Sequence, residues 1–179
     1  RLRSEPSGGL LLWFAGLRRP LHLVVGVDAT ADGAWQPRFA ISAPHADVAL
    51  RIRSAALAPD AITAALGIAP SRQARAGMTL DGGAAERDFH LWLRDLLPGD
   101  PAPADEKIAA LLDLLAPQQR ALGDLLRGSS DACVTVAWHA DAERMDGLRF
   151  APALLARLAG LGLGLELDLH AELPGPPTS

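Results

Sequence analysis

Four short segments of this chain alternate between large apolar side chains and mostly small or polar ones, and this period of two constrains the fold more than any other feature. They centre on residues 48–52, 89–93, 134–138 and 165–169. Successive side chains of a strand point to opposite faces, so each segment is predicted to be a strand with one buried face. The four strands are predicted to form one sheet.

The segments between these strands show helical signals instead. Helices are predicted from Pro59 to Gly67, from Asp105 to Gly128 with a bend at Pro117, and from Pro152 to Gly160. Their apolar stripes need a surface to cover, and the apolar face of the sheet supplies one. The predicted fold is therefore α+β, a two-layer sandwich of a four- or five-stranded mixed or antiparallel sheet with helices on one face.

The inward residues of these elements are predicted to form one core. Its members are Val48, Leu50, Ile52, Ile62, Leu66, Leu91, Leu112, Leu115, Val136, Leu155, Leu158 and Leu167. We expect a single α+β domain over residues 46–171. Residues 1–45 are predicted to be an N-terminal extension that is either poorly defined or a hairpin in which 21–27 pairs with 36–42. Residues 172–179 are predicted to be a disordered tail.

Composition excludes several functional classes. The formal charge of -4 over 179 residues argues against nucleic-acid binding, which needs a strongly basic domain. The apolar run at residues 10–17 is far shorter than the roughly 20 residues that span a bilayer, so no membrane segment is expected. Cys133 is the only cysteine, which excludes an internal disulfide and favours a cytoplasmic location. Lys107 is the only lysine and tyrosine is absent, which suggests a GC-rich bacterial genome.

Several segments match a known family in their order and spacing. They are Ala49–Arg53, Leu57–Thr63, Leu66–Ser71, Gly77, Trp92, Phe150–Leu155 and Leu161–His170. Over residues 46–171 the chain resembles the bacterial family called domain of unknown function 4279. The resemblance implies the architecture and a bacterial origin, but no catalytic residue, because the family has no established activity. The last strand of the family commonly ends in aspartate, an apolar residue and tyrosine, where this chain has His170.

The sheet face opposite the helices is the candidate functional site. Strand alternation places on it the predicted binding residues Arg51, Arg53, His90, Trp92, Arg94, His139, Glu166, Asp168 and His170. An exposed tryptophan among charged groups is typical of a protein-binding surface. We therefore expect Trp92 to be at least partly exposed there, unless the N-terminal segment covers it.

Three interpretations of this face remain open. It is an ordinary solvated surface, or a binding surface, or a small enzyme or metal site that uses His90, His139 or His170 with Asp168. No phosphate-binding loop, nucleophile elbow or metalloprotease motif is present, so no cofactor and no catalytic or metal-ligating residue is assigned. The working hypothesis is a noncatalytic binding module that captures another protein, by analogy with small bacterial immunity proteins. The oligomeric state is left open.

Overall fold

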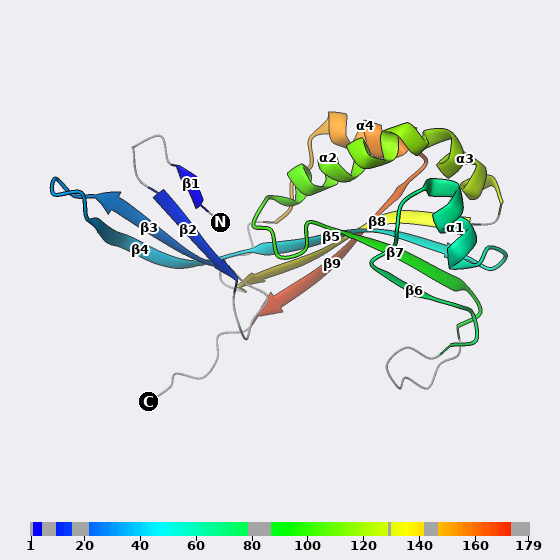
Figure 1. Ribbon diagram of the computed structural model, residues 1–179, viewed down its shortest axis with the longest axis horizontal. Coiled ribbons are helices and arrows are strands. Elements are labelled where there is room, and N and C mark those ends of the chain that lie inside the picture. The colour runs from blue at the N-terminus through cyan, green and yellow to red at the C-terminus, as the bar shows by residue number, and fades with distance from the viewer. Residues whose placement is uncertain are drawn as a thin grey trace.

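The computed structural model describes residues 2–4, 10–15, 22–78, 87–128, 130–141 and 147–172, which form two separate sheets. The first sheet, here called the arm, is antiparallel and has the order β1-β2-β3-β4. Its strands are β1 (Leu2–Ser4), β2 (Leu10–Ala15), β3 (His22–Ala29) and β4 (Trp35–Ala43). Figure 1 shows the arm projecting away from the rest of the molecule.

The second sheet has five strands in the order β6-β7-β5-β8-β9. They are β5 (His45–Ser54), β6 (Arg72–Ala74), β7 (His90–Leu96), β8 (Ser130–Asp141) and β9 (Gly164–Glu172). Only β9 runs parallel to its neighbour, so the sheet is mixed. The number of strands agrees with the predicted four or five, but β6 lies in a stretch that was predicted to be a loop, and residues 148–150, predicted as a possible short strand, do not form one.

The helices all cover one face of the five-stranded sheet (Figure 1), which confirms the predicted two-layer α+β fold. They are α1 (Pro59–Leu66), α2 (Ala104–Leu115), α3 (Gln119–Arg127) and α4 (Pro152–Gly160). A 3-10 turn at Ala116–Gln118 separates α2 from α3. Proline lacks the N–H that continues an α-helix, so the chain bends at Pro117 as predicted. Among the helices described, none is both long and apolar enough to cross a membrane.

The core lies between the helices and this sheet. Nine of the twelve predicted core residues belong to it, and Leu50, Ile52 and Leu115 have no exposed surface. The prediction was wrong for Leu155 and Leu167, whose exposed fractions are 43% and 45%. Leu154 and Leu158 take the buried positions on α4 instead, and Leu167 lies on the edge strand β9, beyond the cover of the helices.

The third error concerns Leu91 and changes the whole of β7. Trp92 lies opposite Ile52, an inward residue of β5, and is completely buried. Its indole Nε1 donates a hydrogen bond of 3.0 Å to Thr63 Oγ1 on α1. Leu91 and Leu93 therefore point to the other face, where they lie opposite Arg53 and Arg51. The prediction that Trp92 is exposed is therefore wrong, because the two faces of β7 are the reverse of those assigned from the sequence.

The only lysine of the chain is buried where the pairing of β7 with β5 ends. The last pair is Val48 with Leu96, and Lys107 Nζ donates a 2.6 Å hydrogen bond to the carbonyl oxygen of Ala46, two residues further along. A buried carbonyl without a strand partner needs a donor, and Lys107 supplies it. Burial lowers the pKa of Lys107, because removal from water disfavours the ammonium form.

The arm contains the predicted hairpin, since β3 pairs with β4 from His22–Ala43 to Ala29–Trp35. Gly26 lies under the ring of Phe39, and a Cβ at this position would come within 2.4 Å of a ring carbon. Glycine is therefore required for the ring to cross the strand. The arm also exposes large apolar side chains, namely Phe14, Leu23, Trp35 and Ile41.

Candidate functional site: the open face of the five-stranded sheet

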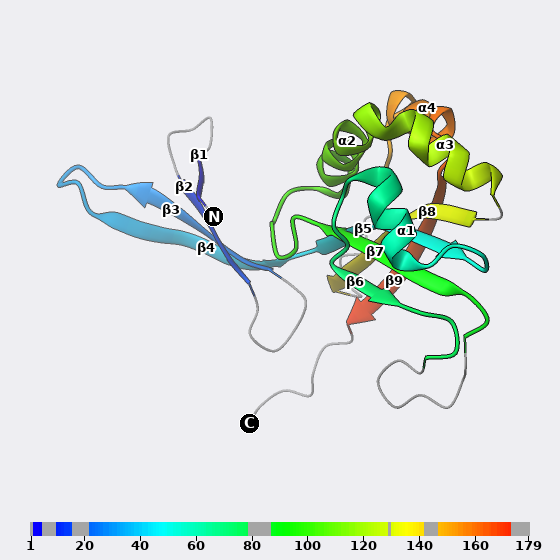
Figure 2. The same ribbon diagram turned by 45° about the vertical axis from the view of Figure 1, so that its right-hand side comes forward.

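The face of the five-stranded sheet that the helices leave uncovered is here called the open face (Figure 2). Strand register places on it six of the nine predicted binding residues: Arg51, Arg53, His139, Glu166, Asp168 and His170. They come from the three neighbouring strands β5, β8 and β9. The alternation of these strands was sufficient to find them, because each strand has one clearly apolar side.

The other three predicted residues do not belong to this group. Trp92 is in the core, and β7 turns His90 and Arg94 to the same side as Trp92. His90 Nδ1 accepts a hydrogen bond of 3.1 Å from the backbone N–H of Ala76. Arg94 donates to the carbonyl oxygen of Ala69 at 3.3 Å. Both side chains hold the loop between α1 and β7 and are separate from the open face.

The arginines of the open face, both on β5, are neutralised by carboxylates on β8 and β9. Arg51 binds Glu166 through both guanidinium NH groups, at 2.7 and 2.5 Å. Arg53 binds Asp131 at 2.6 Å. The hydrogen bond from Arg51 lowers the pKa of Glu166, because it stabilises the carboxylate. With both arginines paired, the middle of the face is not a site for an anion.

Three histidines form a row at the end of the open face nearest the arm. His45, His139 and His170 lie side by side in register on β5, β8 and β9. The rings of His139 and His170 stack with centroids 4.5 Å apart. His45 was not among the predicted residues, although counting back in twos along its strand from Arg51 reaches it.

Two carboxylates contact this row. Asp47 Oδ1 lies 2.8 Å from Nε2 of His45, and its Oδ2 lies 3.9 Å from Nε2 of His139. The hydrogen bond from His45 is the main reason why the pKa of Asp47 is lowered. On β9, Asp168 Oδ2 lies 3.1 Å from Nε2 of His170. When the histidines are neutral, this end of the face is acidic, since no arginine pairs with Asp47 or Asp168 in the described structure.

The structure separates the residues named in the enzyme or metal interpretation. His90 is on another face, and no group of His, Cys, Asp or Glu within the described ranges is arranged to hold a metal ion. His170 and Asp168 are both open to solvent, at 45% and 68% side-chain exposure. Burial raises the pKa of the Cys133 thiol, which disfavours the nucleophilic thiolate.

The open face ends at a free strand edge. β9 is nine residues long and pairs with β8 on one side, and no strand in the described structure pairs with its other side. Leu167 and Leu169, on the helix side of β9, are 45% and 56% exposed. An edge of this kind presents unpaired backbone N–H and C=O groups together with exposed apolar side chains.

The fold and the open face together define an α+β domain whose mixed sheet is covered by helices on one side only. Residues 44–172 match the family described as Domain of unknown function (DUF4279), and the chain belongs to this family. The resemblance found in the sequence is thereby confirmed. Comparisons with curated proteins and with solved structures give no match.

Proposed function

We propose that this protein is a noncatalytic binding module that captures another protein through the open face and the free edge of β9. The observation that carries the proposal is the nine-residue edge strand β9, which has no neighbour on its outer side among the described strands. A strand added there forms backbone hydrogen bonds that give affinity, while its alternate side chains give specificity. Such capture is the mode of action that the analogy with immunity proteins suggested.

The two sides of β9 specify the chemistry of the partner strand. Leu165, Leu167 and Leu169 alternate with Glu166, Asp168 and His170, so apolar residues line the helix side and mainly acidic groups the open side. Opposite charges and apolar pairs are the favourable cross-strand neighbours. The matching partner is an extended segment that alternates apolar residues with arginine or lysine.

A second copy of β9 fits this edge less well than a basic strand does. Antiparallel self-pairing centred on Leu167 sets Glu166 opposite Asp168, and self-pairing centred on Asp168 sets that carboxylate opposite itself. Like charges directly opposite one another destabilise a strand pair. The edge therefore favours a basic partner over a homodimer.

Two synthetic peptides of alternating sequence test the proposal, one of valine with arginine and the other of valine with glutamate. We expect saturable binding of the arginine peptide alone, with slowed amide exchange and NMR shift changes confined to β9 and its neighbour β8. An arginine peptide N-methylated at alternate amides on its pairing edge should not bind. Equal binding of all three peptides, or changes at β6 rather than β9, would contradict strand addition at this edge.

A pair of charge reversals supplies the matched control. Asp168→Lys places a positive charge on the edge strand and should abolish binding of the arginine peptide. Asp113→Lys makes the same change on α2, where Asp113 is bound to Arg157 instead. It should leave binding intact. If both variants bind as well as the unchanged protein, the acidic side of β9 does not select the partner.

A further inference from the structure

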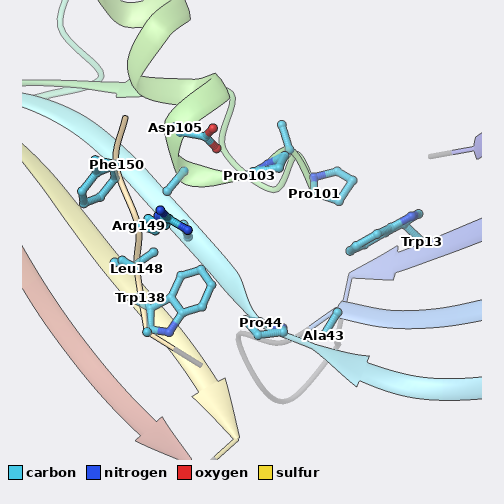
Figure 3. Close-up of a pocket in the computed structure, with 14 residues that line it drawn as sticks. Trp13, Ala43, Pro44, Pro101, Pro103, Asp105, Trp138, Leu148, Arg149 and Phe150 are labelled. Carbon is cyan, nitrogen blue, oxygen red and sulfur yellow. The ribbon is translucent and has the colours of Figure 1, made fainter. Parts of the chain in front are cut away.

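A second candidate site lies on the other side of the sheet, where the arm meets the helical layer. A cavity of about 290 Å³ opens between β2, the start of β5, β8 and the loop before α2. Figure 3 shows Trp13 at one end of the cavity and Trp138 at the other. Pro44 and Pro103 lie on opposite walls between the two tryptophans. Because its walls are aromatic rings and prolines, the cavity suits an apolar group.

Two charged side chains also line this cavity, and they differ from the other charged groups described above. Asp105 comes from the first turn of α2, and Arg149 from the segment that precedes α4. Both side chains are exposed at the mouth of the cavity, and among the described residues neither makes a hydrogen bond or ion pair, with each other or with another group. By contrast, Arg51, Arg53 and Arg157 are all bound to carboxylates. One unpaired charge of each sign is therefore available to a ligand at the cavity.

We propose that the cavity binds a small apolar α-amino acid. Such a molecule carries a carboxylate for the guanidinium of Arg149, an ammonium for the carboxylate of Asp105, and an apolar side chain for the aromatic and proline walls. A guanidinium binds a carboxylate through two parallel hydrogen bonds, which fixes the ligand's orientation. The volume is at the small end of the roughly 300–1,000 Å³ typical of ligand sites, which fits a single amino acid better than a cofactor.

This site requires both parts of the molecule. Trp13 belongs to the arm, whereas Asp105, Trp138 and Arg149 belong to the five-stranded domain. It is independent of the open face, because Trp138 lies opposite Leu169 and Ala46 on the helix side of the sheet. A negative result in the peptide experiment at β9 would therefore not count against the amino-acid site. A negative result in the amino-acid experiment would likewise not count against strand addition at β9.

Isothermal titration with three related molecules tests the assignment. L-Phenylalanine carries both charges, 3-phenylpropanoate lacks the ammonium group, and 2-phenylethylamine lacks the carboxylate. We expect saturable binding of phenylalanine, and weakening on the order of tenfold or more for each analogue, since each loses a charge-assisted hydrogen bond. Absence of saturable phenylalanine binding, or equal binding of all three molecules, would overturn the proposal.

Substitutions with matched controls locate the binding. Arg149→Gln should weaken phenylalanine binding by about tenfold or more, while Arg120→Gln, on the surface of α3, should not change it. Trp13→Ala should also weaken binding, whereas Phe14→Ala, whose side chain turns to the opposite face of the arm, should not. Thermal unfolding of each variant reports its folding separately. Retained binding in folded Arg149→Gln and Trp13→Ala proteins would place the ligand elsewhere and refute this site.

Discussion

The arm and the five-stranded sheet are built by the same strand pairing, but they differ in what covers them. In the five-stranded sheet, Leu50 and Ile52 are fully buried beneath the helices. In the arm, Val24 and Val27 are buried but Phe14 and Trp35 remain about half exposed, and none of the described helices lies on either side. Burial of apolar surface is the dominant favourable term in folding. The comparison indicates that stability resides in the contact between helices and sheet, and that strand pairing alone supplies little of it.

Substitution of the two tryptophans gives the largest expected contrast. Trp92→Ala should lower the free energy of unfolding by about 3–5 kcal/mol, because it opens a large cavity in the core and removes the hydrogen bond to Thr63. Trp35→Ala in the arm should change it by less than about 0.5 kcal/mol. Urea unfolding of both variants measures the difference. Similar midpoints would show that the two sheets contribute alike.

A pair of leucines on α2 repeats the contrast within a single helix. Leu112 is 1% exposed and Leu114 is 38% exposed. Leu112→Ala should destabilise the protein by about 2–5 kcal/mol, whereas Leu114→Ala should cost well under half as much. Chemical denaturation of both variants provides the measurement. An unchanged midpoint for Leu112→Ala would show that the helical layer is oriented differently.

Sequence alternation predicted β5, β8 and β9 but failed on β7, and the reason is physical. Both faces of β7 carry large apolar residues, with Leu91 and Leu93 on one and Trp92 on the other. Because two leucines stand against one tryptophan, the sequence favoured the leucines as the buried side of the strand. The larger side-chain volume of Trp92 and its indole hydrogen bond to Thr63 favour burial of Trp92 instead. A buried indole needs an acceptor, and a sequence does not show that Thr63 is close. The leucines are only partly buried, beside β6 and opposite the arginines of β5.

The candidate site was predictable to the same extent as the strand faces. Six residues on β5, β8 and β9 were predicted correctly because each strand has one apolar side. Three residues on β7 were assigned to the wrong face, because both sides of that strand are apolar. His45 was missed because its strand begins earlier than the clear alternation at residues 48–52. The cavity could not be predicted at all. It depends on where the arm meets α2, and that placement involves no local sequence pattern.

Removal of residues 1–43 tests whether the arm contributes to the stability of the domain. The described strands of the arm pair with no strand of the five-stranded sheet, and the family match begins at residue 44. A protein that starts at Pro44 keeps His45, with which the pairing of β5 and β8 begins. We expect it to unfold cooperatively, with a loss no greater than about 1–2 kcal/mol from the exposed surface near Trp138. Differential scanning calorimetry would show a broad, noncooperative transition if the arm is required for folding.

The smallest expected effect is a dependence on pH that distinguishes a carboxylate of the domain from one of the arm. Asp47 is hydrogen-bonded to the buried His45, and this bond lowers the pKa of Asp47 in the folded protein. A carboxyl group with a lowered folded-state pKa stabilises the protein above its unfolded-state pKa of about 3.9. That contribution is lost as the pH falls through the lower, folded-state value.

Asp47→Asn should therefore cost stability at pH 7 and progressively less as the pH falls below about 4. The side chain is 51% exposed, so solvent screening limits the cost to roughly 0.5–1 kcal/mol. Asp28→Asn in the arm is the matched control, because Asp28 lies 3.8 Å from an exposed Arg38 and contacts no buried group in the described structure. We expect no change for it at any pH. Urea midpoints measured at pH 7, 5 and 3 decide the question, and an equal cost of Asp47→Asn at all three values would mean that its ionised form is not what stabilises this end of the sheet.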